Sequence, residues 1–253
     1  MRREKVSIVT PTFEREPFLR LAHRTIRAQT YQDWEWLILD DSPKPSEYLR
    51  SVTDPRVRYL HTAGRMEIGR KRNELAAAAA GSVIAHFDDD DYYAPSYVER
   101  MLRRLDAGCD FVKLSGWYLY AVAYRALGYW DLNRKTGRVH VWQPPQPRTA
   151  RRLTNENNRG LENVHLGYGF SYVYRTEVWR RQPFSGHAFR GEDEPFASAA
   201  RAAFRVEHFR DLRGICLHVL HASNTSRCFP QYELPRFMLR ALFPRAVEDY
   251  LTL

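Results

Sequence analysis

The sequence predicts an α/β protein built on a doubly wound, mostly parallel sheet. Short apolar runs alternate with helical segments through the first half of the chain, and this alternation is typical of parallel strands covered by helices. Four consecutive aspartates, residues 88–91, directly follow one of the apolar runs. Open α/β sheets bind their ligands at the carboxyl ends of strands, so the acidic run fits the same architecture.

The elements of the first half are predicted in chain order. Residues 6–10 form an apolar strand, and residues 17–29 form a helix with Leu19, Ala22 and Ile26 on its inner face. The helix at 69–80 follows from its alanine content, and Pro95 marks the start of another helix. The full series continues with strands at 34–39 and 57–60, the helix at 69–80, a strand at 83–87, a helix at 95–106 and a strand at 111–114.

The alternation breaks in the second half. Residues 131–159 combine Pro144, Pro145 and Pro147 with many Asn and Arg residues, so we expect a long loop or a partly ordered insertion. Beyond it we expect a strand at 170–174, helices near 177–181 and 192–203, strands at 205–209 and 215–220, and a helix at 235–242. Without a repeat or a clear linker, we expect one domain over 1–253, with a nucleotide-binding half at about 1–115 and a variable half with a smaller, mixed subregion at about 116–253.

Composition indicates which classes of partner and which cellular compartment to expect. The formal net charge is +9, and 34 of the 39 basic residues are arginine. Arginine suits anionic partners such as nucleotide diphosphates, nucleic acid or anionic lipid, although a GC-rich genome would produce the same bias. Cys109, Cys216 and Cys228 lack metal-ligand spacing, and no signal-peptide region or run of membrane-span length occurs. We therefore expect a cytoplasmic protein with at most peripheral membrane contact.

The aspartate run is the strongest single signal for chemistry. Repulsion among four adjacent carboxylates raises the pKa of some of them unless a cation offsets the charge. Hard oxygen ligands suit Mg²⁺ or Mn²⁺, which keep coordination positions open for phosphate oxygens. The alternative is a solvated acidic turn that caps a helix N-terminus.

Several motifs stand in an order that is typical of one enzyme family. They are VSIVTPTF at 6–13, LILDDS at 37–42, IGRKRN at 68–73, HFDDDD at 86–91, and YRTEVW at 174–179 followed by GED at 191–193. Over residues 5–225 this ordered set resembles the family 2 glycosyltransferases. The resemblance implies a GT-A fold and a metal-dependent, inverting enzyme that uses Mn²⁺ or Mg²⁺. It also implies transfer from a nucleotide diphosphate sugar, most often a UDP-sugar, to a hydroxyl group of a glycan or lipid-linked acceptor.

The resemblance also implies roles on the donor side. The turn formed by Pro11, Thr12, Phe13 and Glu14 lines the nucleobase pocket, and Asp41 hydrogen-bonds the base. Two positions depart from the family pattern, since Glu14 replaces an asparagine and Ser42 replaces the glycine after the aspartate pair. Cations at a helix N-terminus oppose its dipole, so the basic group around the helix at 69–80 suggests an anionic ligand. Its members are Arg65, Arg70, Lys71 and Arg72, of which Arg72 matches a donor-side arginine of the family.

Asp88, Asp89 and Asp90 match the DxD element of the family. The resemblance implies that Asp90 coordinates the metal and that Asp88 contacts the ribose, or the metal through water. Asp91 is expected to cap or orient the following helix.

Two further residues complete the predicted site. The resemblance makes Asp193 the general base that takes a proton from the acceptor hydroxyl, although residues 192–194 alone would read as an acidic helix N-terminus. His221 resembles a family histidine that binds metal or phosphate, and a structural histidine is the alternative. Aromatic residues could stack on acceptor sugars or belong to the core; they are Trp117, Tyr118, Tyr120, Trp130 and Trp142.

Other classes of function fit less of the sequence. A nucleic-acid-binding protein would leave both acidic groups unexplained and shows no recognisable reading motif, so no nucleic-acid partner is expected. A catalytically inactive GT-A module that binds nucleotide or glycan is argued against by Asp90 and Asp193. A nucleotidyltransferase also pairs carboxylates with metal and phosphate, but the chain lacks a glycine-rich phosphate loop.

Overall fold

The computed structural model describes residues 4–154, 156, 166–186, 191–224 and 228–244. Contacts within the chain divide it into two units. The first unit comprises Met1–Asp90, Pro95–Lys113 and Leu166–His208, and the second comprises Asp91–Ala94, Leu114–His165 and Phe209–Leu253. Strand β6 (Phe111–Ala121) pairs with β11 (Val206–Arg210).

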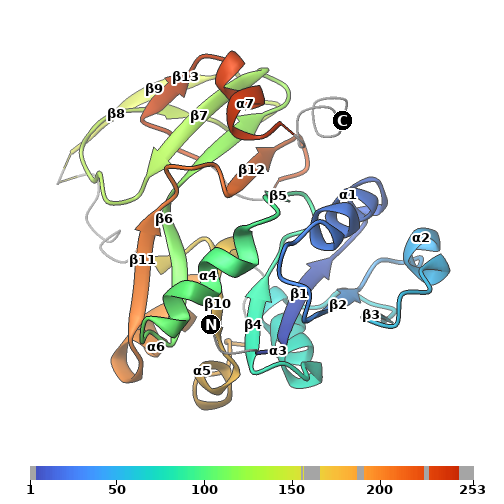
Figure 1. Cartoon of the computed structure of the whole chain (residues 1–253). Coiled ribbons are helices and arrows are strands. Elements are labelled where there is room, and N and C mark those ends of the chain that lie inside the picture. The colour runs from blue at the N-terminus through green and yellow to red at the C-terminus, as the bar shows by residue number, and fades with distance from the viewer. Residues whose placement is uncertain (1–3, 155, 157–165, 187–190, 225–227, 245–253) are drawn as a thin grey trace. The chain divides into compact units, whose positions relative to one another are not determined.

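The first unit is built on a mostly parallel sheet, as the sequence predicts. Its parallel strands are β1 (Val6–Thr12), β2 (Trp34–Asp40), β3 (Val57–His61) and β4 (Val83–His86), in the order β4-β1-β2-β3 (Figure 1). β10 (Val173–Arg175) runs antiparallel between β4 and the start of β6. The register sets Thr12 opposite Asp40, so the carboxyl ends of β1 and β2 lie side by side.

Helices cover both faces of this sheet. Val9, Leu37 and Ile84 share one apolar cluster with residues of α3 (Ile68–Ala78), α5 (Thr176–Arg181) and α6 (Asp193–Ala203). Trp36 alternates with Leu37 and therefore faces the other side, where His23 of α1 (Glu16–Arg27) packs 5.3 Å from its ring. α4 (Tyr97–Asp106) is joined to the end of α1, because Gln29 Oε1 accepts a hydrogen bond from the Val98 amide. This arrangement confirms the doubly wound prediction.

The second unit is mainly antiparallel. β7 (Ala126–Asp131) lies between β6 and β13 (Tyr232–Leu234), while β12 (Cys216–Leu220) pairs with β6 and with the short β5 (Tyr92–Tyr93). A separate hairpin consists of β8 (Gly137–Val141) and β9 (Thr149–Leu153). The last described helix is α7 (Phe237–Leu242).

Of the two alternatives for residues 131–159, the structure agrees with the partly ordered insertion, because β8 and β9 form a hairpin within the segment; residues 155 and 157–159 lie outside the described residues. Other expectations about individual elements were wrong. The strand predicted at 111–114 continues to residue 121, and the strand predicted at 170–174 is a 3₁₀ turn (Gly169–Ser171) followed by β10. The sequence reading also missed α2 (Glu47–Ser51), β5, β7 and β13.

The aromatic residues considered for sugar stacking belong to the core. Trp117, Tyr118, Tyr120, Trp130 and Trp142 are all buried. No helix in the described part of the chain combines the length and apolarity that crossing a bilayer requires.

Candidate functional site

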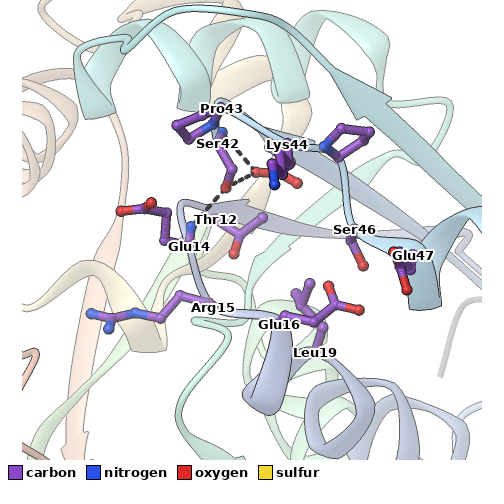
Figure 2. Close-up of a pocket in the computed structure, with 12 residues that line it drawn as sticks. Thr12, Glu14, Arg15, Glu16, Leu19, Ser42, Pro43, Lys44, Ser46 and Glu47 are labelled. Atoms are coloured by element: carbon purple, nitrogen blue, oxygen red, sulfur yellow. Dashed lines mark hydrogen bonds between the residues drawn. The ribbon is translucent and has the colours of Figure 1, made fainter.

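A cavity of about 480 Å³ opens where β1 and β2 end (Figure 2). Its walls come from the turn between β1 and α1 and from the loop between β2 and α2. The predicted residues Thr12 and Glu14 line it, together with Arg15, Glu16, Leu19, Asp40, Ser42, Pro43, Lys44, Pro45, Ser46 and Glu47. Most of these residues are polar or charged, although the surface that they present to the cavity is more apolar than polar.

The turn at the cavity rim holds a strained residue. Glu14 has a φ of 53°, a region that non-glycine residues other than Asn and Asp rarely adopt. Its amide donates to Ser42 Oγ at 2.7 Å, and the Ser42 amide donates to Asp40 Oδ1 at 2.9 Å (Figure 2). Tyr59 donates to the other oxygen of Asp40 at 2.6 Å. These bonds fix the β2–α2 loop against the β1–α1 turn.

Asp41 is buried and both of its oxygens are engaged by the protein. Lys71 Nζ donates to Oδ1 at 2.7 Å, and the Met66 amide donates to Oδ2 at 2.7 Å. Lys71 also donates to the carbonyl of Thr12 at 3.0 Å. Burial lowers the pKa of Lys71, and the adjacent Asp41 opposes that shift. Asp41, the predicted base contact, therefore forms a buried pair with Lys71 that connects β1, the end of β2 and α3.

Arg65 and Arg70, two further members of the basic group, lie in different surroundings. Arg65 lies 3.8 Å from Asp41 Oδ1, and its guanidinium stacks over the Phe13 ring at 3.5 Å. Arg70 instead pairs with Glu74 one turn along α3, and its side chain is 63% exposed. Arg65 therefore lies with the predicted pocket residues, whereas Arg70 lies on the outer surface of its helix.

The aspartate run separates into side chains with different surroundings. Asp88 is 33% exposed, whereas Asp89 and Asp90 are buried. Thr12 Oγ1 donates to Asp89 at 2.5 Å. The pKa of Asp89 is raised well above its usual range by burial first and by the charge of Asp90 second. The upward pKa shift that the sequence predicts within the aspartate run therefore occurs at Asp89. Charge repulsion from Asp90 contributes less to it than burial does.

Asp91 does not cap the next helix, contrary to expectation. Its oxygens accept from the Val219 amide at 2.9 Å and from His218 Nδ1 at 2.8 Å. β5 intervenes before α4 and pairs with β12, and this pairing directs Asp91 toward β12. Burial opposes protonation of His218, but Asp91 outweighs it and raises the pKa of His218 well above the usual range.

Arg72 is the buried centre of the candidate site. Its guanidinium donates to Glu192 Oε1 at 2.8 Å and to His86 Nδ1 at 2.8 Å, and it lies 3.8 Å from Asp88. Burial lowers the pKa of Arg72, but Glu192 and Asp88 outweigh it and the net shift is upward. Burial and the Arg72 charge hold the pKa of His86 well below its usual value, so His86 is neutral and its Nε2 contacts the Tyr174 hydroxyl at 3.0 Å.

Asp193 begins α6 directly after Glu192. Its Oδ2 accepts from the Gly169 amide at 2.9 Å, and its carbonyl accepts from the Tyr172 hydroxyl at 3.0 Å. Glu194 turns away, because its carboxylate accepts from Ser198 at 2.7 Å. Of the three adjacent carboxylates, Glu192 is therefore paired with Arg72, Glu194 with its own helix, and Asp193 with the Gly169 turn.

Lys113 is a further buried ionisable residue near Asp193. Its Nζ donates to the Gly167 carbonyl at 2.5 Å. Burial lowers its pKa to about 7, partly opposed by the Asp193 charge. Sequence reasoning placed Lys71 in the basic group but missed its pairing with Asp41, and it missed Lys113. A single charged residue inside an otherwise apolar strand, as in Phe111–Ala121, is the signal that could have identified Lys113.

The carboxylates of Asp88 and Asp90 are chemically suited to bind a divalent cation. Asp88 and Asp90 offer hard oxygen ligands, and Mg²⁺ or Mn²⁺ commonly takes only one or two carboxylates with phosphate oxygens completing its shell. Across the described ranges, no group of three His, Cys, Asp or Glu side chains is arranged to hold a metal without such phosphates. His221 lies in the second unit after β12, where its Nδ1 accepts from the Ser223 amide at 3.2 Å.

Comparison with known proteins gives one family. The model of glycosyl transferase family 2 matches residues 7–213. The chain is 29% identical over 220 residues to the uncharacterized glycosyltransferase EpsJ of Bacillus subtilis, a match that covers 80% of this chain and 58% of EpsJ. It is 26% identical over 182 residues to the Escherichia coli UDP-Glc:alpha-D-GlcNAc-diphosphoundecaprenol beta-1,3-glucosyltransferase WfgD, covering 69% of this chain and 67% of WfgD. The chain thus spans less than two thirds of EpsJ.

The fold also resembles a solved structure. Residues 1–349 of S. aureus TarS in complex with UDP-GlcNAc superpose with a TM-score of 0.64 at 16% identity, over 87% of this chain and 60% of the TarS chain. At this identity the likeness establishes the fold.

Proposed function

The chain belongs to glycosyl transferase family 2, and we propose that it transfers a sugar from a UDP-sugar to a hydroxyl group of a glycan or lipid-linked acceptor. The proposed reaction inverts the anomeric centre and uses Mn²⁺ or Mg²⁺. The proposal assigns donor binding to the half at about 1–115 and acceptor binding with the catalytic base to about 116–253.

The position of Arg72 is the observation that carries this proposal. One buried guanidinium lies beside Asp88 of the aspartate run and pairs with Glu192, the residue before Asp193. The two acidic groups are far apart in the sequence, yet Arg72 draws them together within the first unit. A transferase needs this proximity, because the donor diphosphate and the acceptor hydroxyl react at adjacent atoms.

On the donor side, several contacts support a nucleotide diphosphate. Thr12 and Glu14 line a cavity at the ends of β1 and β2, and Asp89 is held inward by Thr12. This leaves Asp88 and Asp90 as the residues that would hold the cation between protein and diphosphate. When bound, the cation would stabilise negative charge on the leaving diphosphate. TarS is solved with UDP-GlcNAc and WfgD is named for UDP-Glc, which favours uridine.

On the acceptor side, Asp193 is the proposed base. Its carboxylate takes the proton of the acceptor hydroxyl while that oxygen bonds to the anomeric carbon and the bond to the diphosphate breaks. The Gly169 amide and the start of α6 orient the carboxylate. The name of WfgD specifies a diphosphoundecaprenol-linked acceptor, which favours a lipid-linked acceptor for this chain.

A screen of nucleotide sugars tests the proposal. The full chain is incubated with Mn²⁺ or Mg²⁺ and a panel of UDP-, GDP- and TDP-sugars, and release of the nucleotide diphosphate is measured with and without candidate acceptors. We expect metal-dependent release from a UDP-sugar that an acceptor accelerates. Nucleotide binding without any turnover would identify an inactive module, and release of pyrophosphate from a nucleoside triphosphate would identify a nucleotidyltransferase.

A further inference from the structure

Lys113 is a buried ionisable residue that the proposed reaction does not use. It lies on β6 between Val112 and Leu114, and its side chain is fully buried. Burial of an ammonium group is costly unless the protein supplies polar partners for it. An apolar side chain of similar length, such as that of methionine, would avoid this cost. A lysine in such a place therefore points to a function near its ammonium group.

The ammonium group of Lys113 contacts the turn formed by residues 166–169, which we call the 166–169 turn. Its Nζ donates to the Gly167 carbonyl at 2.5 Å. The Tyr172 hydroxyl donates to the Leu166 carbonyl, one residue earlier. Tyr168, the next residue of the turn, has a φ of 65°, and strained backbone of this kind persists only where its surroundings hold it. Two buried side chains therefore fix successive carbonyl groups of a strained turn.

The last residue of the 166–169 turn carries the hydrogen bond that orients Asp193. The Gly169 amide donates to Asp193 Oδ2 at 2.9 Å. A Cβ at Gly169 would lie only 3.1 Å from the Asp193 Cβ, so the backbone of the turn packs directly against the base of this side chain. The position of the Asp193 carboxylate therefore depends on where the turn is held.

Lys113 and Asp193 also interact through their charges. Burial lowers the pKa of Lys113 to about 7, and the Asp193 charge opposes this shift. Lys113, the 166–169 turn and Asp193 all belong to the first unit. Within that unit, they form one chain of contacts that begins at a buried ammonium group and ends at the proposed base.

We propose that Lys113 is a positioning residue of the transfer reaction, which holds the 166–169 turn so that the Gly169 amide keeps the Asp193 carboxylate directed toward the acceptor hydroxyl. The inference rests on the proposed function, because it takes Asp193 as the base. Lys113 is fully buried, so it acts through the turn and not on the substrate. Displacement of a reacting group by about 1 Å can reduce a rate by about a hundredfold, and this sets the size of the expected effect.

The test is a double-mutant cycle on the full chain. It compares the unmodified protein, Lys113→Met, Asp193→Asn and the double variant, with Mn²⁺ and the UDP-sugar and acceptor that give turnover in the screen. We expect Lys113→Met to lower kcat by about tenfold to a hundredfold and to leave the affinity for UDP with Mn²⁺ unchanged. In Asp193→Asn the same substitution should have little further effect, because the side chain that Lys113 positions can no longer take a proton.

Hydrogen exchange measures the hold on the turn without any turnover. In Lys113→Met we expect the Gly169 amide to exchange at least about tenfold faster, whereas the amides of β1 and β2 should be unchanged. Gly169→Ala is a second variant, which keeps the inference testable if Lys113→Met does not fold. Its added methyl group would press on the Asp193 side chain, so it should lower kcat while Lys113 is intact.

Glu35→Gln is the control for loss of a buried ionisable group. Glu35 lies near the start of β2, at the opposite end of the strand from the cavity, and accepts from Ser7 Oγ at 2.6 Å and from the Ala80 amide at 2.7 Å. We expect this variant to melt at a lower temperature but to keep its kcat wherever it is folded. A fall in kcat at Lys113→Met alone would therefore report on the site and not on the sheet.

Each outcome decides the inference. Unchanged kcat in Lys113→Met, or in Gly169→Ala if Lys113→Met does not fold, would overturn it. Equal losses of kcat with and without the Asp193 carboxylate, or a matching loss of UDP affinity, would also overturn it, because both describe a general structural role. A fully active Asp193→Asn protein would remove the base and the inference together.

Failure of the proposed function can be distinguished from failure of the inference. An unmodified protein without transfer activity would refute the proposed function. Faster exchange of the Gly169 amide in Lys113→Met would then still support the hold of Lys113 on the turn, and unchanged exchange would overturn it.

Discussion

At the scale of single residues, the direction of each carboxylate determines what it can do. Glu192, Asp193 and Glu194 are adjacent in sequence, yet they contact Arg72, the Gly169 amide and Ser198 respectively. Substitution of each of these three carboxylates should therefore have a different effect. The sequence alone could not separate them, because each partner comes from a different element or a different turn.

Asp193→Asn should reduce sugar transfer by roughly 10²-fold to 10⁴-fold. Asparagine keeps the shape and can accept the Gly169 hydrogen bond, but it cannot take a proton. Binding of UDP with metal should be unchanged. Glu194→Gln is the matched control, because Glu194 contacts Ser198 and not the Gly169 turn. Transfer rate and melting temperature are measured on both variants. A fully active Asp193→Asn enzyme, or a product with retained anomeric configuration, would remove Asp193 from its role.

Asp90→Asn should abolish metal-dependent binding of UDP and leave the fold intact. Removing one charge from a repulsive group can only relieve repulsion in the protein without ligands. Asp106→Asn, at the exposed end of α4, is the control for the loss of one carboxylate. Titration calorimetry with Mn²⁺ and UDP measures the effect. Undiminished affinity in Asp90→Asn would exclude Asp90 as the metal ligand.

Lys113 should make the free energy of unfolding increase as the pH rises above about 7. Its folded pKa of about 7 lies below that of an unfolded lysine. Between these two values the unfolded chain binds more protons, so the free energy of unfolding should rise with pH, by up to about 1.4 kcal/mol per pH unit from this group. Lys113→Met should remove that increase and be more stable near pH 7. Urea unfolding between pH 7 and pH 10 measures both slopes, and parallel slopes would contradict the prediction.

At the scale of elements, periodicity predicted most of the first unit and little of the second. The strands at β1, β2 and β4 were predictable because they are nearly continuous apolar runs flanked by helices. β8 and β9 were not, since arginines occupy their exposed positions and obscure the short apolar alternation around Val139. The pair of Lys71 with Asp41 likewise depends on how α3 packs against β2, which local sequence does not encode.

Gly69→Ala should destabilise the start of α3 by roughly 1–3 kcal/mol. A Cβ at Gly69 would lie 1.9 Å from the Ser185 carbonyl oxygen, so the backbone of one segment must move. Gly186→Ala is the matched control, because a Cβ there meets no atom within 4 Å. Urea unfolding of both variants gives the difference in free energy. Equal free energies of unfolding for the two variants would show that the segment 184–186 can move away from the added methyl group without loss of stability.

At the scale of the whole molecule, ligand binding should be visible as stability. UDP should stabilise the chain only with Mn²⁺ or Mg²⁺, by about 2.7 kcal/mol at a hundredfold excess over Kd. The reason is that the aspartate run repels a diphosphate unless a cation lies between them. Thermal unfolding with UDP and metal, with UDP and chelator, and with other nucleotides measures this. Equal stabilisation with chelator would contradict the cation bridge, and a response to another nucleotide alone would change the donor.

The place of β10 has a consequence for synthesis. β10 lies between β4 and β6, but the ribosome makes it after β7, β8 and β9. Until β10 has been synthesised, the backbone groups of β4 and β6 that bond to it are therefore unpaired. Unpaired strand edges can form hydrogen bonds with other chains and so promote aggregation. Non-local pairing of this kind also slows folding. Nascent chains stalled before residue 173 should consequently aggregate or recruit chaperones more than the full chain does.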